Sequence, residues 1–417
     1  MTLHSATPAN DPVAPDQPVL RYGDAEAGLN KNVAGLFAVA CGLAVANAYY
    51  AQPLLDTLAD EFSIDRSAIG VVITATQVGY GIGLILLVPL GDVLNRRRLI
   101  VAQSLLSAVA LLVVSYAPNA IVLLGGMGAV GFLAVVTQTL VAYASILARP
   151  AERGQTVGVV TSGVIIGILL ARTVSGTLSD VFGWRSVYLV SAAATLVVCA
   201  LLYKALPVHE ASKARVSYPR LIWSVFILFV EEPLLRTRAF IGLLIFGVVN
   251  MLWTPMVFPL SSAPFFLSHT QVGLFGLAGA MGALGASSAG RLADSGHAQR
   301  STGIALALML VAWLPISLLS TSIWFLIAGV LIIDFALQAA HVSNQTLIFR
   351  VKPEARSRLT AAYMVFYSIG CAIGSIGSTL IYAYGGWASV CATAAFFSAV
   401  ALVFWWTTRH VGQSDNT

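Results

Sequence analysis

The stretch "PLGDVLNRRR" (residues 89–98) has a counterpart half a chain later, "GRLADSGHAQR" (residues 290–300). Both place an acid a few positions before basic residues, Asp92 before Arg96, Arg97 and Arg98, and Asp294 before Arg300. Two more pairs keep the same offset of 202 or 203 residues: "RPAERG" (149–154) with "KPEARS" (352–357), and "GWRSV" (183–187) with "GWASV" (386–390). Three pairs at one offset predict that the chain is an internal duplication.

The composition places both copies in a membrane. The chain has 417 residues, of which 58% are hydrophobic and 10% charged, whereas a soluble domain carries about 25% charged residues. A membrane-spanning helix needs about 20 consecutive apolar residues. Counted on that length, the uncharged stretches are Asn32–Leu55, Ser67–Gly91, Leu99–Ala148 (two spans), Gly154–Leu178, Ser186–Tyr203, Ala239–Gly290 (two), Ser301–Ile348 (two) and Leu359–Thr408 (two). The sequence therefore predicts an all-α membrane protein with twelve transmembrane helices in two pseudo-symmetric six-helix halves.

The expected halves are residues 32–203 and 239–408. Residues 1–31 hold four prolines among small and acidic residues and are expected to form a disordered cytoplasmic tail. Residues 409–417 form a second cytoplasmic tail. Between the halves, residues 204–238 are a cytoplasmic linker whose apolar segment "LIWSVFILFV" (221–230) either lies at the membrane interface as a helix or extends a neighbouring helix.

The positive charges predict the orientation, because cytoplasmic loops retain Lys and Arg. Of the 23 Lys and Arg residues, Arg172 lies in a span and only Arg66 and Arg185 lie in odd-numbered loops. Both termini are therefore expected in the cytoplasm, and a bacterial inner membrane fits this plan. The pI near 9.1 follows from the topology, so no nucleic-acid partner is expected.

The loop after helix 2, with Asp92 followed by Arg96–Arg98, resembles the signature of the major facilitator superfamily. The helix 5 stretch "GVIIGILLARTVSG" (163–176) resembles the glycine-rich segment of drug and metabolite proton antiporters in that family. The resemblance covers residues 32–408 and implies a central cavity lined by helices 1, 4, 7 and 10. It also implies a gating role for the two loops, whose residues are Asp92, Arg96, Arg97, Arg98, Gly290, Arg291, Asp294 and Arg300. A solvated, positively charged loop is the alternative.

Two formally charged residues lie deep in the expected spans, Arg172 in helix 5 and Asp334 in helix 10. Each costs about 2.5–3.5 kcal/mol at a helix centre, so both should face a cavity or each other. We expect Arg172 to face the cavity, where it attracts an anionic group or holds Asp334. The alternative is an arginine that extends to the lipid headgroups.

Helix 10 carries a polar stripe. Asp334, Gln338, His341 and Gln345 are spaced by four, three and four residues, which places them on one helical face. Gln138 on helix 4 lies 203 residues before His341 and is its expected counterpart across the cavity. Asp334 and His341 either carry a coupled proton, bind a polar substrate or brace helix packing.

The remaining cavity candidates are Asn47, Tyr49, Tyr50 and Gln52 on helix 1, Gln77 and Tyr80 on helix 2, and Asn250 and Trp253 on helix 7. Tyr49, Tyr50 and Trp253 are equally suited to anchoring helices at the membrane interface. Glycines spaced along helices 8 and 11 suit a sliding contact between the halves or close static packing.

Sequence motifs argue against an enzyme, since HExxH, P-loop and cysteine–histidine nucleophile patterns are missing from the sequence. We expect a secondary active transporter that needs no cofactor or metal and draws on a proton gradient. Proton-coupled efflux of a drug or metabolite by antiport is the first expectation. Proton-symport uptake of a small organic anion and a non-transporting membrane sensor are the alternatives. The expected partners are a small-molecule substrate and the lipid bilayer, and the protein is expected to be a monomer.

Overall fold

The computed structural model describes residues 30–149, 152–206, 218–352 and 356–411, without the side chains of residues 92, 293, 294, 356 and 357. Helices and short turns make up these described ranges, and no strand occurs in them. The expected disordered tail at residues 1–31 lies almost entirely outside the described residues, as do most of residues 409–417.

The first half contains helices 1 to 6. Helix 1 runs through α1 (Lys31–Tyr49), η1 (Gln52–Leu54) and α2 (Leu55–Phe62), and helix 2 is α3 (Val71–Leu86), followed by the short α4 (Leu90–Val93). Helix 3 is α5 (Arg96–Ser115), helix 4 is α6 (Ala120–Ala134) with α7 (Val136–Leu147), helix 5 is α8 (Arg153–Phe182), and helix 6 is α9 (Trp184–Ala205).

The second half repeats the plan. Helix 7 is α11 (Pro233–Trp253) with α12 (Val257–Ser261), and helix 8 is α13 (His269–Leu274), η2 (Phe275–Gly279) and α14 (Ala280–Asp294). Helix 9 is α15 (Ala298–Ser317), helix 10 is α16 (Ile323–Phe349), and helices 11 and 12 are the two parts of α17 (Arg356–Thr408). Ten helices of the described chain are long and apolar enough to cross a membrane, the last of them containing both parts of α17, and α3 is a shorter apolar helix of 10–17 residues. The predicted all-α fold with twelve membrane helices is therefore confirmed.

Backbone breaks fall at corresponding places in the two halves. Gly183, between helices 5 and 6, has φ 81°, and Gly386, inside α17, has φ 66°. Such angles favour glycine because a Cβ atom is strained there. Each glycine precedes the tryptophan of the repeated Gly-Trp pair, so the repeat seen in the sequence marks the same turn twice. Pro53 and Pro255 likewise interrupt helices 1 and 7, since proline cannot donate the helical hydrogen bond.

Short polar side chains set several helix starts. The side chains of Asn30, Asn95 and Asn119 accept hydrogen bonds from the backbone N–H groups of Asn32, Arg98 and Val122 at 3.0, 3.1 and 3.0 Å. These N-caps satisfy donors that an apolar helix would leave unpaired at the membrane surface. The caps thus fix where α1, α5 and α6 begin.

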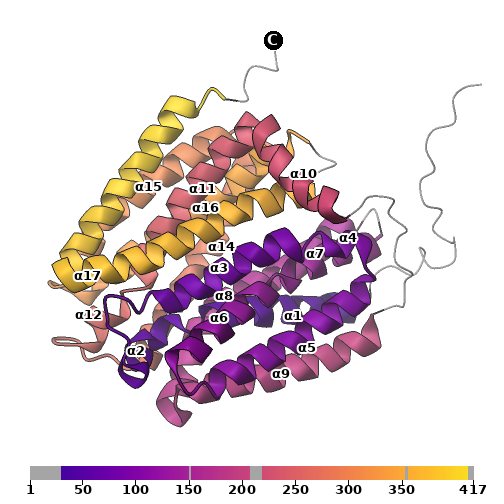
Figure 1. Ribbon diagram of the computed structural model, residues 1–417. Coiled ribbons are helices and arrows are strands. Elements are labelled where there is room, and N and C mark those ends of the chain that lie inside the picture. The colour runs from indigo at the N-terminus through magenta and orange to yellow at the C-terminus, as the bar shows by residue number, and fades with distance from the viewer. Residues whose placement is uncertain (1–29, 150–151, 207–217, 353–355, 412–417) are drawn as a thin grey trace, which may run out of the picture.

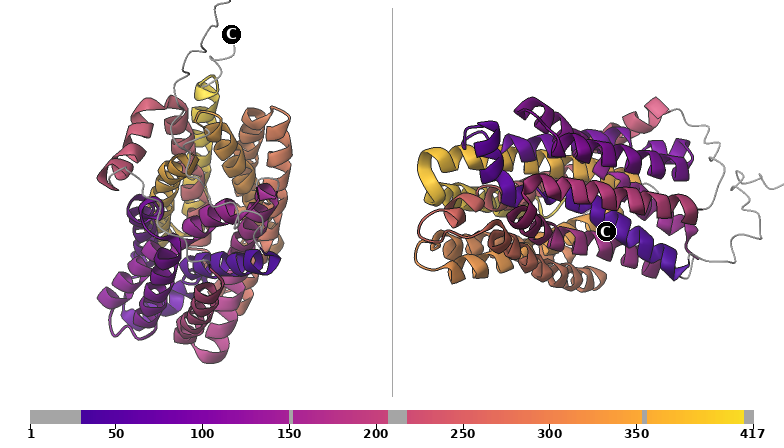
Figure 2. Two further views of the ribbon diagram at one scale, coloured as in Figure 1. Left: turned by 90° about the vertical axis from the view of Figure 1, so that its right-hand side faces the viewer. Right: turned by 90° about the horizontal axis from the view of Figure 1, so that it is seen from below.

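The helices form two groups that meet along two seams (Figure 1). The early helices, indigo to magenta, lie together, and the later helices, pink to yellow, lie together (Figure 2, left). At the seams α3 packs against α17, and α8 packs against α13 and η2. We call the end of the bundle that carries residues 30 and 411 the terminal face, and the opposite end, with Gly183 and Gly386, the distal face.

The linker contributes a separate helix, α10 (Tyr218–Glu231). It does not extend α11, because Glu232 between them has φ −107° and ψ 97°. α11 begins at Pro233, ahead of the expected Ala239, and proline is favoured in the first turn of a helix. One face of α10 buries Val225 and Leu228, while its opposite apolar side chains, Trp223, Phe226, Ile227 and Val230, are exposed. This amphipathic pattern suits a helix that lies at a membrane surface.

Lys352 ties α10 to the loop after α16. Its ammonium group lies 2.8 Å from the Glu232 carboxylate and 2.9 Å from that of Glu231. The hydrogen bonds to Glu232 and Glu231 raise the pKa of Lys352 above its usual value. The linker helix is therefore fastened to the second half.

Candidate functional site

Arg172 lies at the centre of the contact between the halves. The side chain is 6% exposed, and its Nε donates a hydrogen bond to Gln52 Oε1 at 2.6 Å. The guanidinium carbon lies 3.7 Å from the centre of the Trp253 ring and 5.3 Å from that of Tyr49. Desolvated cation–π contacts of this kind contribute about 2 kcal/mol. Helices 1, 5 and 7 thus enclose one positive charge.

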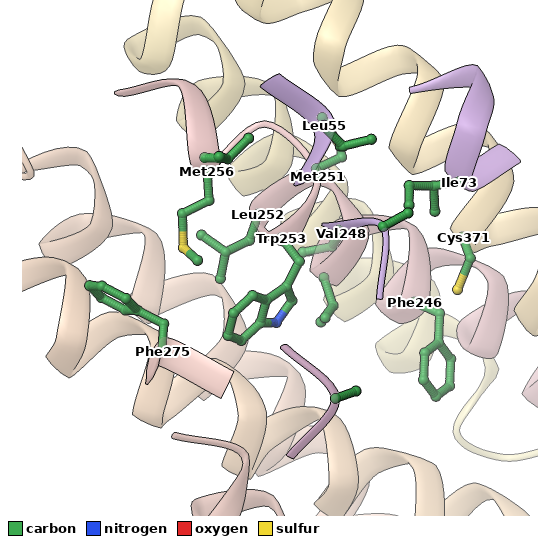
Figure 3. Packing of buried hydrophobic residues seen from close by; sticks show 14 of the residues in the cluster. Leu55, Ile73, Phe246, Val248, Met251, Leu252, Trp253, Met256, Phe275 and Cys371 are labelled. Atoms are coloured by element: carbon green, nitrogen blue, oxygen red, sulfur yellow. The ribbon is translucent and has the colours of Figure 1, made fainter. Parts of the chain in front are cut away.

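Trp253 connects this charge to Asp334. The Asp334 carboxylate is 8% exposed and interacts electrostatically with Arg172 and with the nearby Trp253 side chain. No ion pair of 4.0 Å or less joins Arg172 to Asp334 among the contacts of the described residues. Figure 3 shows the Trp253 ring among apolar neighbours, including Leu252, Met256 and Phe275. The tryptophan therefore lies next to both charges, with its ring face toward Arg172.

Two glycines of helix 8 make room for these side chains. A Cβ atom on Gly276 would lie 3.0 Å from Arg172 Cβ, and one on Gly279 would lie 2.9 Å from Leu169 Cδ2 and 3.7 Å from Asp334 Oδ2. Helix 8 can pass between helices 5 and 10 because both positions lack a side chain. The glycines of helix 8 therefore shape the charged site as well as the seam between helices 5 and 8.

The polar stripe of α16 continues from Asp334 toward the terminal face. Gln338 packs against helix 8, where a Cβ atom on Gly282 would lie 2.9 Å from its Cγ. His341 Nδ1 lies 3.2 Å from the Tyr363 hydroxyl. Gln345 is half-buried one turn further along. All four stripe residues thus lie within the bundle.

A series of aromatic rings links the two halves beside the stripe. Gln138 Nε2 donates to the Tyr80 hydroxyl at 3.3 Å, and the Tyr80 ring lies 6.1 Å from that of Tyr367. Tyr367 lies 4.2 Å from the Phe246 ring, which in turn lies 5.2 Å from His341. Gln138 and His341, the predicted counterparts, are therefore connected through three intervening rings.

Tyr367 also contacts the residues that surround Arg172. Its hydroxyl hydrogen-bonds with that of Tyr49 at 2.8 Å, and Tyr49 flanks Arg172. Tyr49, Gln52, Tyr80 and Trp253, named from the sequence, are thereby brought together with Arg172 and Asp334. We call this set, with Tyr367, the central site.

The distal face is closed by a clasp between α8 and α13. Asp180 Oδ1 accepts from the backbone N–H of His269 at 3.2 Å and lies 2.8 Å from its Nδ1. Asp180 Oδ2 accepts from the backbone N–H and hydroxyl of Thr270 at 2.8 and 2.6 Å. On its other side His269 Nε2 lies 2.9 Å from the Thr57 hydroxyl. An acid at the end of helix 5 therefore caps the start of helix 8 across the seam.

The second seam is also tight near the distal face. Thr379 Oγ1 donates to the Ser67 carbonyl at 3.0 Å, and Thr74 Oγ1 donates to the Ala372 carbonyl at 2.9 Å. Nearer the terminal face, the hydroxyl of the linker residue Tyr218 donates to the Leu86 carbonyl at 2.6 Å. The two halves are thus held together at the distal face and around the central site.

Three predicted path residues lie in helix packing instead. Asn47 Oδ1 accepts from Ser191 Oγ at 2.5 Å, which joins helices 1 and 6. The Tyr50 ring meets that of Tyr188, and Asn250 Nδ2 lies 3.0 Å from Cys371 Sγ. These contacts stay within one half, so the structure does not bring the three side chains to the central site. Gln77 is buried in α3, and its Oε1 has no hydrogen-bond partner among the described residues.

The predicted gating residues lie at the terminal face. Arg97 Nη2 donates to the Tyr203 carbonyl at 2.6 Å, which ties helix 3 to helix 6. The backbone N–H of Arg98, in the first turn of α5, donates to the Asn95 cap. Gly290 and Arg291 lie in the last turns of α14, and Arg300 lies in the first turn of α15. Arg96 is the first residue of α5. The side chains of Asp92 and Asp294 lie outside the described residues, so the gating role remains a prediction.

Sequence reasoning missed the distal clasp and Arg238. A readable signal for the first was the capping box, in which Ser268 and Gln271 exchange side-chain and backbone hydrogen bonds at the start of α13. Arg238, assigned to the linker from sequence, lies inside α11 and is 1% exposed. Among the described side chains no group of three metal-ligating residues occurs that could hold an ion.

Two packed groups of membrane helices around a buried, charged site are the architecture of a multi-pass membrane transporter. The family model of the Major Facilitator Superfamily matches residues 37–350 and, separately, 267–417. The uncharacterized transporter YgaY of Escherichia coli O157:H7 is 45% identical over 381 residues, covering 91% of this chain and 96% of that protein. The inner membrane transport protein YnfM of Escherichia coli K12 is 26% identical, over 58% of this chain and 59% of that protein. The chain belongs to the major facilitator superfamily.

Solved structures agree on the fold. A bacterial homologue of the human lysosomal transporter Spinster, in an inward-facing and unoccupied conformation, superposes with a TM-score of 0.72 at 15% identity, covering 92% of this chain and 98% of that one. The human organic anion transporter MFSD10 (TETRAN) superposes with a TM-score of 0.67 at 17% identity, covering 90% and 100%.

Proposed function

We propose that this transporter moves a small solute with an anionic group by alternating access, and that a proton bound at Asp334 accompanies the solute. The observation that carries the proposal is the enclosure of Arg172 by Gln52, Tyr49 and Trp253 in the central site. It supports recognition of an anion, because a buried guanidinium with no carboxylate at ion-pair distance is stabilised when an anionic group binds it. Among the described residues, the recorded hydrogen bond of Arg172 uses Nε and leaves the two Nη groups for a ligand.

Electrostatics couple the anion to the proton. Before a solute binds, Arg172 and Asp334 attract each other as opposite charges. An anion bound to Arg172 competes with Asp334 for that positive charge, and a carboxylate deprived of its partner in a buried site favours protonation. Anion and proton therefore bind more readily together than alone. This coupling supports symport.

The closed distal face supports alternating access. Hydrogen bonds across both seams hold the bundle shut at the distal face. With the termini in the cytoplasm, as the positive charges predict, this state opens inward. The opposite state requires the clasp of Asp180 with His269 and Thr270 to separate.

Proton-coupled antiport for efflux is the second candidate. It is favoured by the single buried carboxylate of the central site, which can hold a proton and a cationic cargo in turn, and by the helix 5 resemblance to antiporters. In that case the proton weakens substrate binding, the opposite sign of coupling from symport. The two candidates therefore differ in the sign of the coupling between proton binding and substrate binding, which can be measured.

Proteoliposomes containing the purified full chain and an internal pH dye test both candidates. Organic acids, drugs, amino acids and sugars are added outside in turn. Inward symport acidifies the lumen, whereas exchange of an entering solute for an internal proton makes it more alkaline. Acidification by organic acids that is lost in Asp334→Asn supports the proposal.

Matched controls separate transport from folding. Arg153→Gln removes an exposed arginine from the start of the same helix and should leave the signal unchanged, while Arg172→Gln should abolish it. Alkalinisation by a cationic drug would replace the proposal with antiport. A folded protein that moves no solute in either direction would favour the non-transporting sensor.

A further inference from the structure

A cavity of about 410 Å³ lies away from the central site, at the terminal face between helices 9 and 12. It is lined by Gly296, His297, Gln299, Arg300, Trp405, Arg409 and His410. Two arginines and two histidines thus surround one space. None of these seven described residues carries a carboxylate.

The start of α15 adds to this positive character. His297 occupies the N-cap position, and no side-chain hydrogen bond caps this 20-residue helix. The first backbone N–H groups of a helix are unpaired, and the helix dipole makes that end attractive to anions. The lining residues Gln299 and Arg300 lie in this first turn. The first turn of α15 and two arginines therefore line the same space.

Gln299 fixes the wall of the cavity. Its Nε2 donates to the Arg409 carbonyl at 2.8 Å, and its Oε1 accepts from Arg238 Nη2. Arg238 Nε and Nη1 are buried and have no hydrogen-bond partner in the described chain. A third positive charge therefore lies behind the wall without a recorded counter-ion. Its field adds to the attraction of an anion in the cavity.

The aromatic lining places the cavity at a membrane surface. Trp405 packs over Gly303, where a Cβ atom would overlap its ring, and the neighbouring Trp406 is exposed. The Arg409 guanidinium lies 3.8 Å from the centre of the Trp406 ring. Tryptophans beside basic residues are typical of the headgroup level of a bilayer.

We propose that this cavity, the terminal basic site, binds a phosphate group, supplied by an anionic phospholipid headgroup or by free phosphate. Arg300 and Arg409 hold the phosphate oxygens in the manner of paired guanidinium groups, and the first turn of α15 donates backbone N–H bonds to it. The exposed Trp406 packs along the adjoining glycerol and acyl region when the source is a lipid.

Native mass spectrometry of the detergent-purified full chain tests the site. Phosphatidylglycerol and phosphatidylcholine are titrated separately, and inorganic phosphate is added in a third series. We expect phosphatidylglycerol to bind at least about tenfold more tightly than phosphatidylcholine, and Arg300→Gln/Arg409→Gln to remove that preference. Arg153→Gln/Arg220→Gln, which loses the same charge at exposed positions of the terminal face, should keep it.

The outcomes distinguish the sources. Preference for phosphatidylglycerol that inorganic phosphate does not displace identifies a lipid, and displacement or binding by inorganic phosphate identifies the free ion. Equal binding of the two lipids without any phosphate binding, or an unchanged preference in the Arg300→Gln/Arg409→Gln protein, overturns the proposal. If the double variant does not fold, Arg300→Gln alone decides, because no hydrogen bond of that exposed side chain is recorded in the described structure.

Discussion

The charge of Arg172 is accommodated by aromatic faces and one amide. The ring of Trp253 lies 3.7 Å from its guanidinium carbon, and Gln52 accepts from its Nε at 2.6 Å. A planar guanidinium can stack on a ring and donate in its own plane at once, which a lysine ammonium cannot. The residue type is therefore required by the geometry of the site as well as by its charge.

Replacement of this arginine tests that requirement. We expect Arg172→Lys to lower the initial transport rate at least about tenfold, because the lost stacking and hydrogen bond together exceed about 1.4 kcal/mol. Arg172→Ala should abolish transport. Rates are measured in proteoliposomes beside Arg153→Gln. A lysine variant that transports at the normal rate would show that charge alone suffices.

At the scale of elements, helices 5 and 8 form the seam that must open and close. Gly176 allows the closest approach, since a Cβ atom there would overlap the His269 carbonyl oxygen. Asp180, one turn further along α8, then reaches the start of α13 with four hydrogen bonds. Close approach and capping therefore act together to hold the distal face shut.

The clasp predicts a shift of the conformational equilibrium. Asp180→Ala removes the capping carboxylate, and a hydrogen bond to a charged group contributes about 1.5–3 kcal/mol. We expect the distal face to open at least about tenfold more often. The readout is the rate at which an impermeant maleimide labels Thr254→Cys, a buried position near that face, in protein without the native cysteines. Asp65→Asn, on the same face but without a recorded contact across the seam, should label at the unaltered rate.

Gly176 and Gly158 form a matched pair on α8. Gly176→Ala places a methyl group against the His269 carbonyl, whereas a Cβ atom on Gly158 meets nothing within 4 Å. We expect Gly176→Ala to raise the same labelling rate and slow transport, and Gly158→Ala to change neither. Equal behaviour of the two variants would mean that the seam does not need this close approach.

At the scale of the whole molecule, two similar halves meet along two seams, and the described ends of the chain lie at one face (Figure 1). Among the described residues, exposed arginines such as Arg153, Arg220 and Arg300 lie at this same face, and Arg66 and Arg185 lie at the other. Membrane insertion retains positive loops in the cytoplasm. The architecture and the charge pattern therefore agree on one orientation.

This orientation predicts the location of the termini. A green fluorescent protein fused after Thr417 should be fluorescent in bacterial cells, because it folds in the cytoplasm. Alkaline phosphatase fused at the same position should be inactive, whereas its fusion after Pro118, in the odd-numbered loop between helices 3 and 4, should be active. The reverse pattern would invert the topology and make the described state open outward.

The sequence was sufficient for the architecture because its signals are local or repeated. Apolar length predicted the spans, the repeated Gly-Trp pair marked equivalent turns, and the energetic cost of charge in a membrane singled out Arg172 and Asp334. The rotation of each helix was not readable in the same way. Asn47, Tyr50 and Asn250 suited a cavity by polarity, yet their side chains contact neighbours within their own half.

The sequence by itself determined a duplicated, twelve-helix membrane protein and the two charges that the membrane must accommodate. Tertiary structure decided the partners of those charges, since Gln52 lies 120 residues from Arg172 and Asp180 lies 89 residues from His269. The physical reason is that hydrophobic length acts along the chain, whereas hydrogen bonds and ring contacts depend on which helix faces meet. Those faces come together only when the helices pack, within the first half for Gln52 and Arg172 and across the seam for Asp180 and His269.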